Sequence, residues 1–434
     1  MAERVGGGAP GLVVFTRDLR LHDHPALSAA LAEHGRVVPV FVRDRTIAAG
    51  SYGSPRRDEY LEEALGDLDR SLRRKGAALV VRRGDWVAEV LRVAAASGAD
   101  RIHVSDDATA YGRSRLERLE RASGPVGREV TRHLGISIVP PGGLAPAGAD
   151  HYRIFTAYYR HWRTARWRSL LPAPRRICMP ADLKTGEGRP GLDVGRAGAA
   201  TGGGATAAAD RLRTWVRQGL AGFGQRDRLT GPGTSRLSAD LHFGCLSPLE
   251  VAAAVAEHDG AEAFLRQLCW RDYFLQIVAA RPSSAWSPGR KPVESGRVAG
   301  RRLALWQEGR TGYPVVDAAM RQLAGEGYLP NRARMIVASF LVNELRVDWR
   351  RGAVHFLRTL VDGDVAVNNL NWQWVVGTDL PRSGFRVLSP LRQGRRFDPD
   401  GDYVRRYVEE LRPLTGRSVH DPDPPTRRRL GYPP

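Results

Sequence analysis

Cysteine is scarce in this 434-residue sequence. The three that occur, Cys178, Cys245 and Cys269, lie far apart and lack the Cys-x-x-Cys or Cys/His spacing of a zinc site. We therefore expect no metal site, and a reducing, cytoplasmic environment. No run approaches the roughly 18 apolar residues of a membrane helix, and no apolar segment near Met1 marks a signal peptide. Membrane-spanning and secreted proteins are not expected.

Acidic charge is in deficit, because 66 Lys+Arg face 47 Asp+Glu and leave a formal net charge of +19. Lysine contributes little, since Lys75, Lys184 and Lys291 are the only lysines. Genomic composition and a solubilising charged face are the alternative explanations of this arginine excess. A polyanionic partner, nucleic acid before an anionic membrane, fits the charge best.

Common nucleotide and hydrolase signatures are also absent, since the sequence has no Walker loop, G-x-S-x-G elbow or H-E-x-x-H motif. Gly6-x-Gly8-x-x-Gly11 spells the dinucleotide fingerprint. That loop must follow a strand and open a helix, whereas this one precedes the first expected strand. We interpret it as an N-terminal tail.

Up to residue 140, short β-rich runs alternate with helical patterns, which is typical of a parallel sheet covered by helices. An apolar face at intervals of three and four residues predicts a helix that starts near Pro55. We predict a doubly wound α/β domain over residues 10–140. Its expected strands are Leu12–Thr16, Val37–Val42, Ala77–Val81, Arg101–Ser105 and Ile136–Val139.

Residues 141–208 contain Pro/Gly/Ala-rich stretches around an aromatic segment, and we interpret them as an interdomain linker. Strand signals nearly vanish after residue 210, so we predict an all-α domain over residues 209–434. Its expected helical segments include Leu249–Val255, Ala261–Ala279, Val315–Leu323, Met335–Leu345 and Val354–Leu360.

Two segments of the helical part suit a ligand. Residues 233–238 place three hydroxyls and Arg236 in six positions, which suits a phosphate, although on its own this segment fits an ordinary helix cap better. Trp270–Tyr273, with Gln267 one turn earlier, suits a flat hydrogen-bonding ligand. A core Trp beside a surface salt bridge is the usual explanation of such a pattern.

A third polar segment runs from Asp362–Asp364 through Asn368 and Asn369 to Trp372–Trp374. Its carboxylates lack the spaced ligands and closing Glu of a calcium loop. Buried asparagines need hydrogen-bond partners, so the segment favours a polar ligand wall over a packed core.

Together these segments resemble the photolyase/cryptochrome family over essentially the whole chain. The matching stretches include Val14–Leu27, Gly309–Arg321, Asn331–Met335 and Asp362–Trp374. The resemblance implies an N-terminal α/β antenna domain and a C-terminal all-helical domain that holds FAD. It also implies a monomeric enzyme that acts on DNA containing pyrimidine dimers.

The resemblance implies three groups of site residues, carried over by position. Those implied to hold FAD are Thr234, Ser235, Arg236, Leu237, Ser238, Arg271, Asp362, Gly363, Asp364 and Asn368, the last beside a flavin ring nitrogen. Those implied to meet the lesion or its strand are Arg226, Gln267, Trp270, Asn331, Arg332, Met335, Trp374, Arg386 and Gln393. Trp372 and Trp349 match the inner two members of an electron relay to the flavin.

This sequence departs from the family pattern at several positions. Gln267 stands where cyclobutane-dimer enzymes of this kind usually have Glu, and Gln is common there in (6-4) photolyases. Asn331 and Met335 nevertheless match the cyclobutane-dimer type. Gly296 occupies the position of the outermost relay Trp. The Asn-Glu pair of folate-binding members aligns with Tyr111-Gly112, so a deazaflavin antenna, or none, is expected rather than folate.

The function implied by the resemblance is light-driven repair of cyclobutane pyrimidine dimers. In such enzymes, photoexcited reduced FAD donates an electron to a dimer that has been flipped out of the duplex. Three alternatives stay open, namely a cryptochrome-type blue-light receptor, a (6-4) photolyase, and a basic DNA-binding protein without catalysis.

Overall fold

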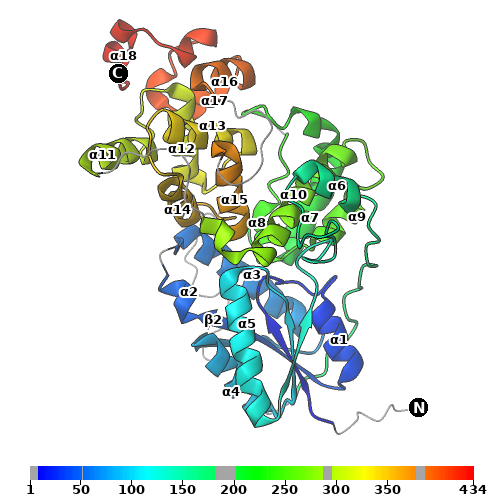
Figure 1. The fold of residues 1–434 in the computed structure, drawn as a ribbon. Coiled ribbons are helices and arrows are strands. Elements are labelled where there is room, and N and C mark those ends of the chain that lie inside the picture. The colour runs from blue at the N-terminus through cyan, green and yellow to red at the C-terminus, as the bar shows by residue number, and fades with distance from the viewer. Residues whose placement is uncertain are drawn as a thin grey trace. The chain divides into compact units, whose positions relative to one another are not determined.

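The computed structural model (Figure 1) describes residues 8–50, 52–180, 183, 202–231, 233–286, 296–377 and 387–434. These residues form two units. The first comprises Met1–Thr214, Leu237–Glu257 and Leu265–Pro282, and the second comprises Trp215–Arg236, His258–Phe264 and Ser283–Pro434. The domain boundaries at residues 140 and 208 stay a prediction.

The first unit is built on a parallel sheet of five strands in the order β3-β2-β1-β4-β5. Because β1 lies at the centre and the chain moves outward on each side of it, the sheet is doubly wound, and the predicted fold class is confirmed. The strands are β1 (Gly11–Phe15), β2 (Val37–Asp44), β3 (Val80–Gly84), β4 (Arg101–Ser105) and β5 (Glu129–His133).

Helices cover both faces of this sheet (Figure 1). On one face, α4 (Trp86–Ser97) and α5 (Ala110–Ser123) bury the alternate strand residues Val14, Val40 and Val104 in a shared apolar core. On the other face, α1 (Pro25–Glu33) packs against β1 and β4. The other helices of the first unit are α2 (Arg45–Ala48), η1 (Gly124–Val126), α3 (Pro55–Arg73), α6 (Phe155–Trp162), α8 (Ser238–Phe243) and α9 (Pro248–Val255).

One predicted strand is wrong, because Ile136–Val139 does not join the sheet. The amide N–H groups of Ile138 and Val139 donate to Asp272 Oδ2 at 3.0 and 2.9 Å, so they have no ladder bonds to give. The fifth strand is β5 instead, at the edge of the sheet, with no fully buried residue. A polar edge strand has little of the apolar pattern by which strands are recognised.

The second unit contains no strand among its described residues, which confirms the predicted all-α character. Its core gathers buried residues of α12 to α15 with residues of α11 and α17. The helices are α11 (Gly296–Gln307), α12 (Pro314–Glu326), α13 (Asn331–Asn343), α14 (Trp349–Thr359), α15 (Val365–Val376), α16 (Pro390–Phe397), α17 (Asp402–Tyr407) and α18 (Pro424–Leu430), with short 3₁₀ turns η2 (Leu220–Gln225), η4 (Glu409–Leu411) and η5 (Gly416–His420). Residues of α7 (Ala205–Gln218), α10 (Ala261–Ala280) and η3 (Pro282–Trp286) belong to both units.

Across the described part of the chain, no helix has both the length and the apolar character that a bilayer crossing requires.

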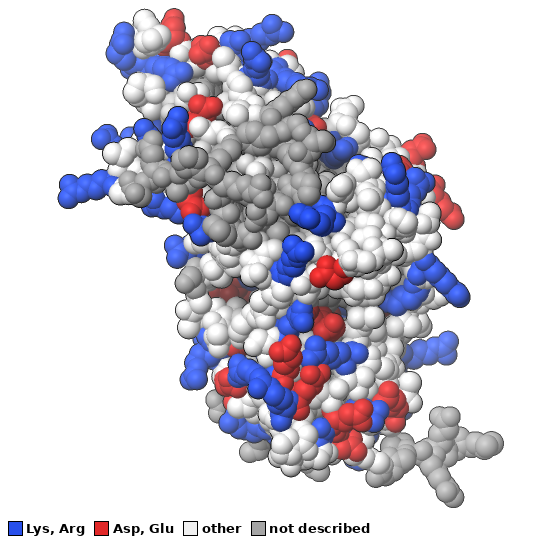
Figure 2. All heavy atoms as spheres, viewed as in Figure 1, with Lys and Arg blue, Asp and Glu red and all other residues white. Residues whose placement is uncertain are grey.

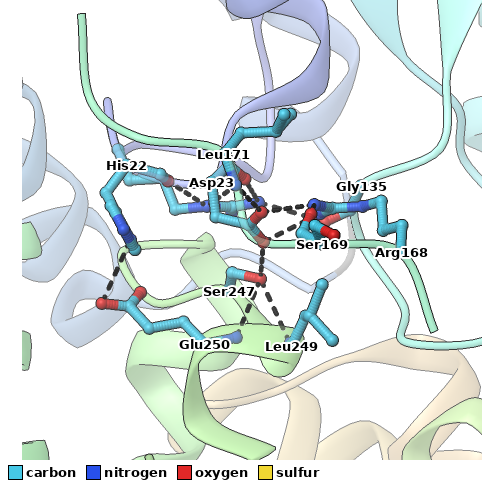
Figure 3. Close-up of polar contacts among 10 residues, drawn as sticks. His22, Asp23, Gly135, Arg168, Ser169, Leu171, Ser247, Leu249 and Glu250 are labelled. Carbon is cyan, nitrogen blue, oxygen red and sulfur yellow. Dashed lines mark hydrogen bonds and ion pairs between the residues drawn. The ribbon is translucent and has the colours of Figure 1, made fainter. Parts of the chain in front are cut away.

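A buried guanidinium, that of Arg20, joins distant segments of the first unit. It lies beside Asp23, whose bonds with Arg168 and Ser247 are drawn in Figure 3. It donates to the carbonyl oxygens of His22 and Asp23 at 3.1 and 2.9 Å. It also donates to Gly135 O at 3.1 Å and Gly244 O at 3.0 Å. The turn after β1 is thereby joined to the segment after β5 and to the end of α8.

The neighbouring carboxylate, Asp23, is fully buried and has a left-handed backbone with φ of 48°. It accepts hydrogen bonds from Arg168, from the Ser247 hydroxyl that caps α9, and from Leu171 N at 3.2 Å. Burial opposes ionisation, but the bonds from Arg168 and Ser247 outweigh it, and the pKa of Asp23 lies below its ordinary value. This contribution to stability is present at neutral pH and is lost as the pH falls through that lowered pKa.

We predict that Asp23→Ala lowers the free energy of unfolding by about 1–3 kcal/mol, because the Ser247 hydroxyl and the Leu171 amide lose their acceptor and Arg168 loses its partner. Urea denaturation of the purified protein measures this. Asp210→Ala is the matched control, since its pair with Arg213 is exposed on both sides and should be worth less than about 1 kcal/mol. An equal loss of unfolding free energy in the two variants would contradict a larger contribution to stability from the buried Asp23 network.

Candidate functional site

Helix α10 carries three of the predicted site residues, all in the first unit. Gln267 is exposed, whereas Trp270 and Arg271 are half-buried. The indole of Trp270 stacks on Phe155 of α6, with ring centroids 3.7 Å apart and planes within 7°. Arg271 donates to the carbonyl oxygen of Ile136. Phe155 thus supports one face of the Trp270 ring, and the indole is held as a rigid platform.

Asp272, the next residue on α10, has a structural role and does not form a surface salt bridge. Its side chain is 2% exposed and accepts hydrogen bonds from the amides of Ile138 and Val139 and from Trp162 Nε1, at 2.9–3.0 Å. Burial raises the pKa of this carboxyl, against the opposing effect of its N–H donors. Asp272 therefore fixes α10 to the segment after β5 and to α6.

In the second unit, the ring of Tyr328 lies between two arginines. The Arg236 guanidinium lies 4.6 Å from the ring centroid, and that of Arg334 lies 6.0 Å from it. The Tyr328 hydroxyl hydrogen-bonds to Thr234, and burial raises its pKa. The sequence did not single out Tyr328, although Arg334 lies inside the matching stretch Asn331–Met335.

Both arginines of this cluster bind a carboxylate. Arg236 Nη2 donates to Glu326 Oε2 at 3.0 Å, and Arg334 Nη2 donates to Asp362 Oδ2 at 2.7 Å. Burial would raise the pKa of Glu326, but hydrogen bonds from Tyr407 and other neighbours hold it below its ordinary value. Arg236 has a φ of 55°, a backbone conformation that non-glycine residues rarely adopt and that is concentrated at functional sites. The structure therefore brings Thr234, Arg236 and Asp362 together.

Part of the polar segment of α15 serves the core of the second unit. Asp364 caps the helix by accepting from Val367 N at 2.9 Å. Asn369 and Gln373, which the sequence placed in the wall, donate to backbone carbonyls of η3 at 2.9 and 2.7 Å. Asn368 donates to Ala353 O and to Asn369 Oδ1. Both its amide hydrogens are engaged, so Oδ1 is the group that it can offer to a ligand.

Two tryptophans of the predicted relay, Trp349 and Trp372, are each 2% exposed. Neither indole N–H finds a hydrogen-bond partner among the described residues. Gly352 gives Trp372 its space, because a Cβ there would lie 2.4 Å from the indole. Trp286 of η3 stacks on Trp349 with centroids 6.5 Å apart and planes within 17°. The sequence did not point to Trp286, because the family pattern places the outermost relay tryptophan at position 296, where this chain has Gly296.

Several predicted DNA-contacting residues lie on α13 and α16 of the second unit. Asn331 Nδ2 lies 3.7 Å from Met335 Sδ, one turn along α13, so these two form a pair. Arg332 binds Asp227 at 2.6 Å, and its Nε is buried without a partner among the described residues. Gln393 Oε1 on α16 is likewise buried without such a partner. Arg386 lies outside the described residues.

The remaining predicted residues have simpler surroundings. Arg226 lies over the Phe223 ring at 4.9 Å, and Trp374 packs against the core of the second unit. Ser235 is half-buried and Gly363 lies in the turn before α15. Leu237 is buried and Ser238 is exposed at the start of α8, in the first unit. Basic side chains on the face shown in Figure 2 are spread over both units rather than gathered in one patch.

Known proteins resemble this chain along nearly its whole length. Residues 12–176 match the family model of DNA photolyase, and residues 264–432 match that of the FAD binding domain of DNA photolyase. A deoxyribodipyrimidine photo-lyase from Streptomyces griseus is 43% identical over 430 residues, which covers 95% of this chain and 92% of the relative. The chain belongs to the photolyase/cryptochrome family. It therefore has that family's FAD-binding domain.

Solved photolyase structures have the same fold. A bacterial class III photolyase from Agrobacterium tumefaciens aligns with a TM-score of 0.90 and 31% identity, covering 100% of this chain and 95% of that one. An archaeal photolyase from Sulfolobus tokodaii with two FAD molecules aligns with a TM-score of 0.84 and 30% identity, covering 98% and 95%.

We predict that Asp272→Ala destabilises the protein by about 1–3 kcal/mol, because it leaves the amides of Ile138 and Val139 and the indole N–H of Trp162 without their acceptor. Hydrogen exchange measured by NMR or mass spectrometry should show faster exchange of the Ile138 and Val139 amides. Unchanged protection of both amides would remove Asp272 from this structural role.

Proposed function

We propose that this protein is a light-driven DNA repair enzyme that splits cyclobutane pyrimidine dimers, with FAD as its cofactor. The observation that carries the proposal is the 43% identity to a deoxyribodipyrimidine photo-lyase over 95% of the chain, together with the FAD-binding match. When bound, reduced FAD supplies the chemistry, because its photoexcited state gives an electron to the dimer and receives it back after the ring has split. The protein supplies binding, orientation and electrostatics.

The donor set around Tyr328 supports a role in holding the FAD phosphates. Thr234 and Ser235 offer hydroxyls and Arg236 offers a guanidinium, which are the groups that bind phosphate oxygens. Asn368 Oδ1, an acceptor, suits a protonated ring nitrogen of the flavin. We assign Asp362, Gly363 and Asp364 to the same cofactor site, with Asp364 also acting as the α15 cap. For Leu237, Ser238 and Arg271, which belong to the first unit, a role in binding FAD is proposed from the family resemblance alone.

The Asn331 and Met335 pair supports the cyclobutane dimer as the lesion, whereas Gln267 is the feature that favours a (6-4) photoproduct. Trp270 and Trp374 offer aromatic surfaces for a flipped, poorly stacked dimer. Arg226, Arg332, Arg386 and Gln393 are proposed to contact the lesion-bearing strand, where arginines bind phosphates. We further propose that the enzyme acts as a monomer in the cytoplasm, consistent with its free cysteines.

Tyr111 and Gly112 support the expectation of a deazaflavin antenna, or none, over folate. A Cβ at Gly112 would lie 2.1 Å from Asp107 Cγ, so the glutamate of folate-binding members does not fit there without rearrangement. The Tyr111 hydroxyl is bound to Asp44. The Sulfolobus photolyase with two FAD molecules shows that a second chromophore other than folate occurs in the family.

The decisive experiment is light-dependent repair of two defined oligonucleotides, one with a cyclobutane dimer and the other with a (6-4) photoproduct. We expect repair of the first under blue light and none in the dark. Repair of the second alone would identify a (6-4) photolyase. Flavin bound without repair of either would identify a receptor, and absence of flavin would leave a DNA-binding protein.

We predict that Trp270→Ala weakens binding to dimer-containing DNA by about 1–3 kcal/mol, the value of one base–aromatic stack, while FAD stays bound. Trp270→Phe, which keeps a ring on Phe155, should retain most of the affinity. Fluorescence anisotropy with a labelled lesion duplex measures the binding, and the flavin absorption measures the cofactor. Equal affinity of Trp270→Ala and wild type would exclude this stack.

We predict that Trp286→Phe slows photoreduction of bound oxidised flavin in the presence of an external reductant, because Trp286 extends the stack beyond Trp349. Repair by enzyme that is already reduced should not change, since that reaction does not use the relay. Trp167→Phe, a half-buried tryptophan of the first unit, is the control and should match wild type. Identical photoreduction rates in all three proteins would mean that electrons reach the flavin by another route.

A further inference from the structure

Three histidines and a glutamate gather at the end of α1, over β4 and β5 of the first unit. His34 follows the last residue of α1, His103 is the middle residue of β4, and His133 ends β5. His34 Nε2 lies 3.3 Å from His103 Nε2, and Glu33 Oε2 lies 3.8 Å from His103 Nε2 and 4.0 Å from His34 Nε2. None of the residues so far assigned to cofactor or DNA belongs to this cluster.

The spacing of the two imidazole nitrogens is that of two ligands on one metal ion. With metal–nitrogen bonds of about 2.0–2.1 Å at a tetrahedral angle, two ligand nitrogens lie about 3.3–3.4 Å apart. The three ligand atoms of Glu33, His34 and His103 all lie within 4.8 Å of one another. A small shift of the Glu33 side chain, which is 40% exposed, would bring its oxygen to the same spacing.

Hydrogen bonds on the far side of each ring orient the imidazoles for this role. His34 Nδ1 lies 3.2 Å from Ala9 O, which fixes the proton on Nδ1 and leaves the Nε2 lone pair facing His103. His103 Nδ1 lies 3.0 Å from His133 Nε2, so His133 Nε2 can accept a hydrogen bond from the N–H at His103 Nδ1. Metal-ligating histidines characteristically donate their second N–H in this way.

The glycine fingerprint near the N-terminus finds an explanation here. Gly11, its last residue, is the first residue of β1, and a Cβ at this position would lie 2.5 Å from the His34 ring. Only glycine leaves room for the imidazole where it stands. The same segment supplies Ala9 O, so residues 9–11 shape the cluster rather than bind a dinucleotide.

We propose that His34, His103 and Glu33 form a binding site for a divalent transition-metal ion of the zinc class, with His133 as a positioning residue. Two imidazoles and a carboxylate are ligands that Zn²⁺ prefers, and the fourth position is left to water. The half-exposed Glu33 gives the ion a path to the fully buried His103. Cysteine spacing in the sequence gives no sign of this site, because its ligands are two histidines and a glutamate. They come from two segments that are far apart in the sequence, the end of α1 and the middle of β4.

Arg101 contacts the proposed ligand Glu33. Its Nη1 donates to Glu33 Oε2 at 3.0 Å, and its Nη2 donates to Glu129 Oε2 at 2.5 Å. Glu129 thus holds the other nitrogen of this guanidinium. A carboxylate oxygen such as Glu33 Oε2 can bind a metal while it accepts from an arginine. The bound ion would link the end of α1 to the middle of β4.

Equilibrium dialysis of the full-length, chelator-treated protein against Zn²⁺ alone tests the proposal. We expect one Zn²⁺ per chain, with affinity about tenfold or more lower in His34→Gln and in Glu33→Gln. These two residues are partly exposed, so the variants should fold, whereas His103 is fully buried. His258→Gln changes an exposed histidine outside the cluster and should bind as wild type does.

The thermal midpoint gives a second readout, because an ion that binds the folded state raises it. Zn²⁺ should raise the midpoint of wild type and of His258→Gln, and not that of His34→Gln or Glu33→Gln. His133→Ala, which removes the acceptor of the His103 Nδ1–H, should bind Zn²⁺ about 10–100-fold more weakly, the usual cost of losing a hydrogen bond behind a ligand. Wild type without stoichiometric Zn²⁺, or His34→Gln with unchanged affinity, would show that the cluster is a hydrogen-bonded histidine chain and overturn the proposal.

Discussion

The buried Arg20 guanidinium is the constraint on which the first unit depends. A charge removed from water costs several kcal/mol unless it is compensated, and here four backbone carbonyls and the nearby Asp23 provide the compensation. These carbonyls belong to segments more than 100 residues apart, such as Gly135 and Gly244. The chain after β1 can adopt its left-handed turn at Asp23 only while those segments are in place. The free energy of folding of the α/β sheet is therefore coupled to the packing of α8 and α9.

Buried polar groups are also compensated on α10, where the Asp272 carboxylate accepts hydrogen bonds from two amides that form no bonds within the sheet. Asp272 satisfies two consecutive amides and an indole N–H, so the chain after β5 can leave the sheet without orphaned donors. It also anchors the helix that carries Gln267, Trp270 and Arg271. A structural residue thus fixes the orientation of its functional neighbours, since adjacent positions on a helix point in directions set by a shared backbone. Precision in the proposed lesion site depends on a residue that contacts no ligand.

The sequence patterns predicted the central strands of the sheet. They did not predict features that depend on contacts between residues far apart in the sequence. The strands β1 and β2 carry buried apolar runs, and β4 carries the buried apolar residues Ile102 and Val104, so their pattern was sufficient. Ile136–Val139 has a similar apolar pattern, but the acceptor of its amides lies on α10 and not in the sheet. Resemblance nominated Thr234, Arg236 and Asp362, and the structure shows them around a tyrosine, Tyr328, that no local pattern distinguishes from core. The sequence also could not show that Asn369 and Gln373 serve the core whereas Asn368 keeps an acceptor for a ligand. The hydrogen-bond partners of Asn369 and Gln373 are backbone carbonyls of η3, which lies far from them in the sequence. The sequence gives the identity of each side chain, but it does not give the distant group to which that side chain is hydrogen-bonded.

Arginine serves structure and charge at once in this protein, and the two uses can be separated. Each internal ion pair, such as Arg334 with Asp362 or Arg321 with Glu410, consumes one charge of each sign and leaves the net +19 unchanged. The excess must therefore be met by something other than this chain's carboxylates. A nucleic acid meets it through counterion release, which gives affinity without regard to sequence or damage. Basic side chains are spread over the visible face rather than gathered in one patch (Figure 2). Because contacts to phosphates carry no information about damage, the proposed recognition of a lesion depends on aromatic and amide groups.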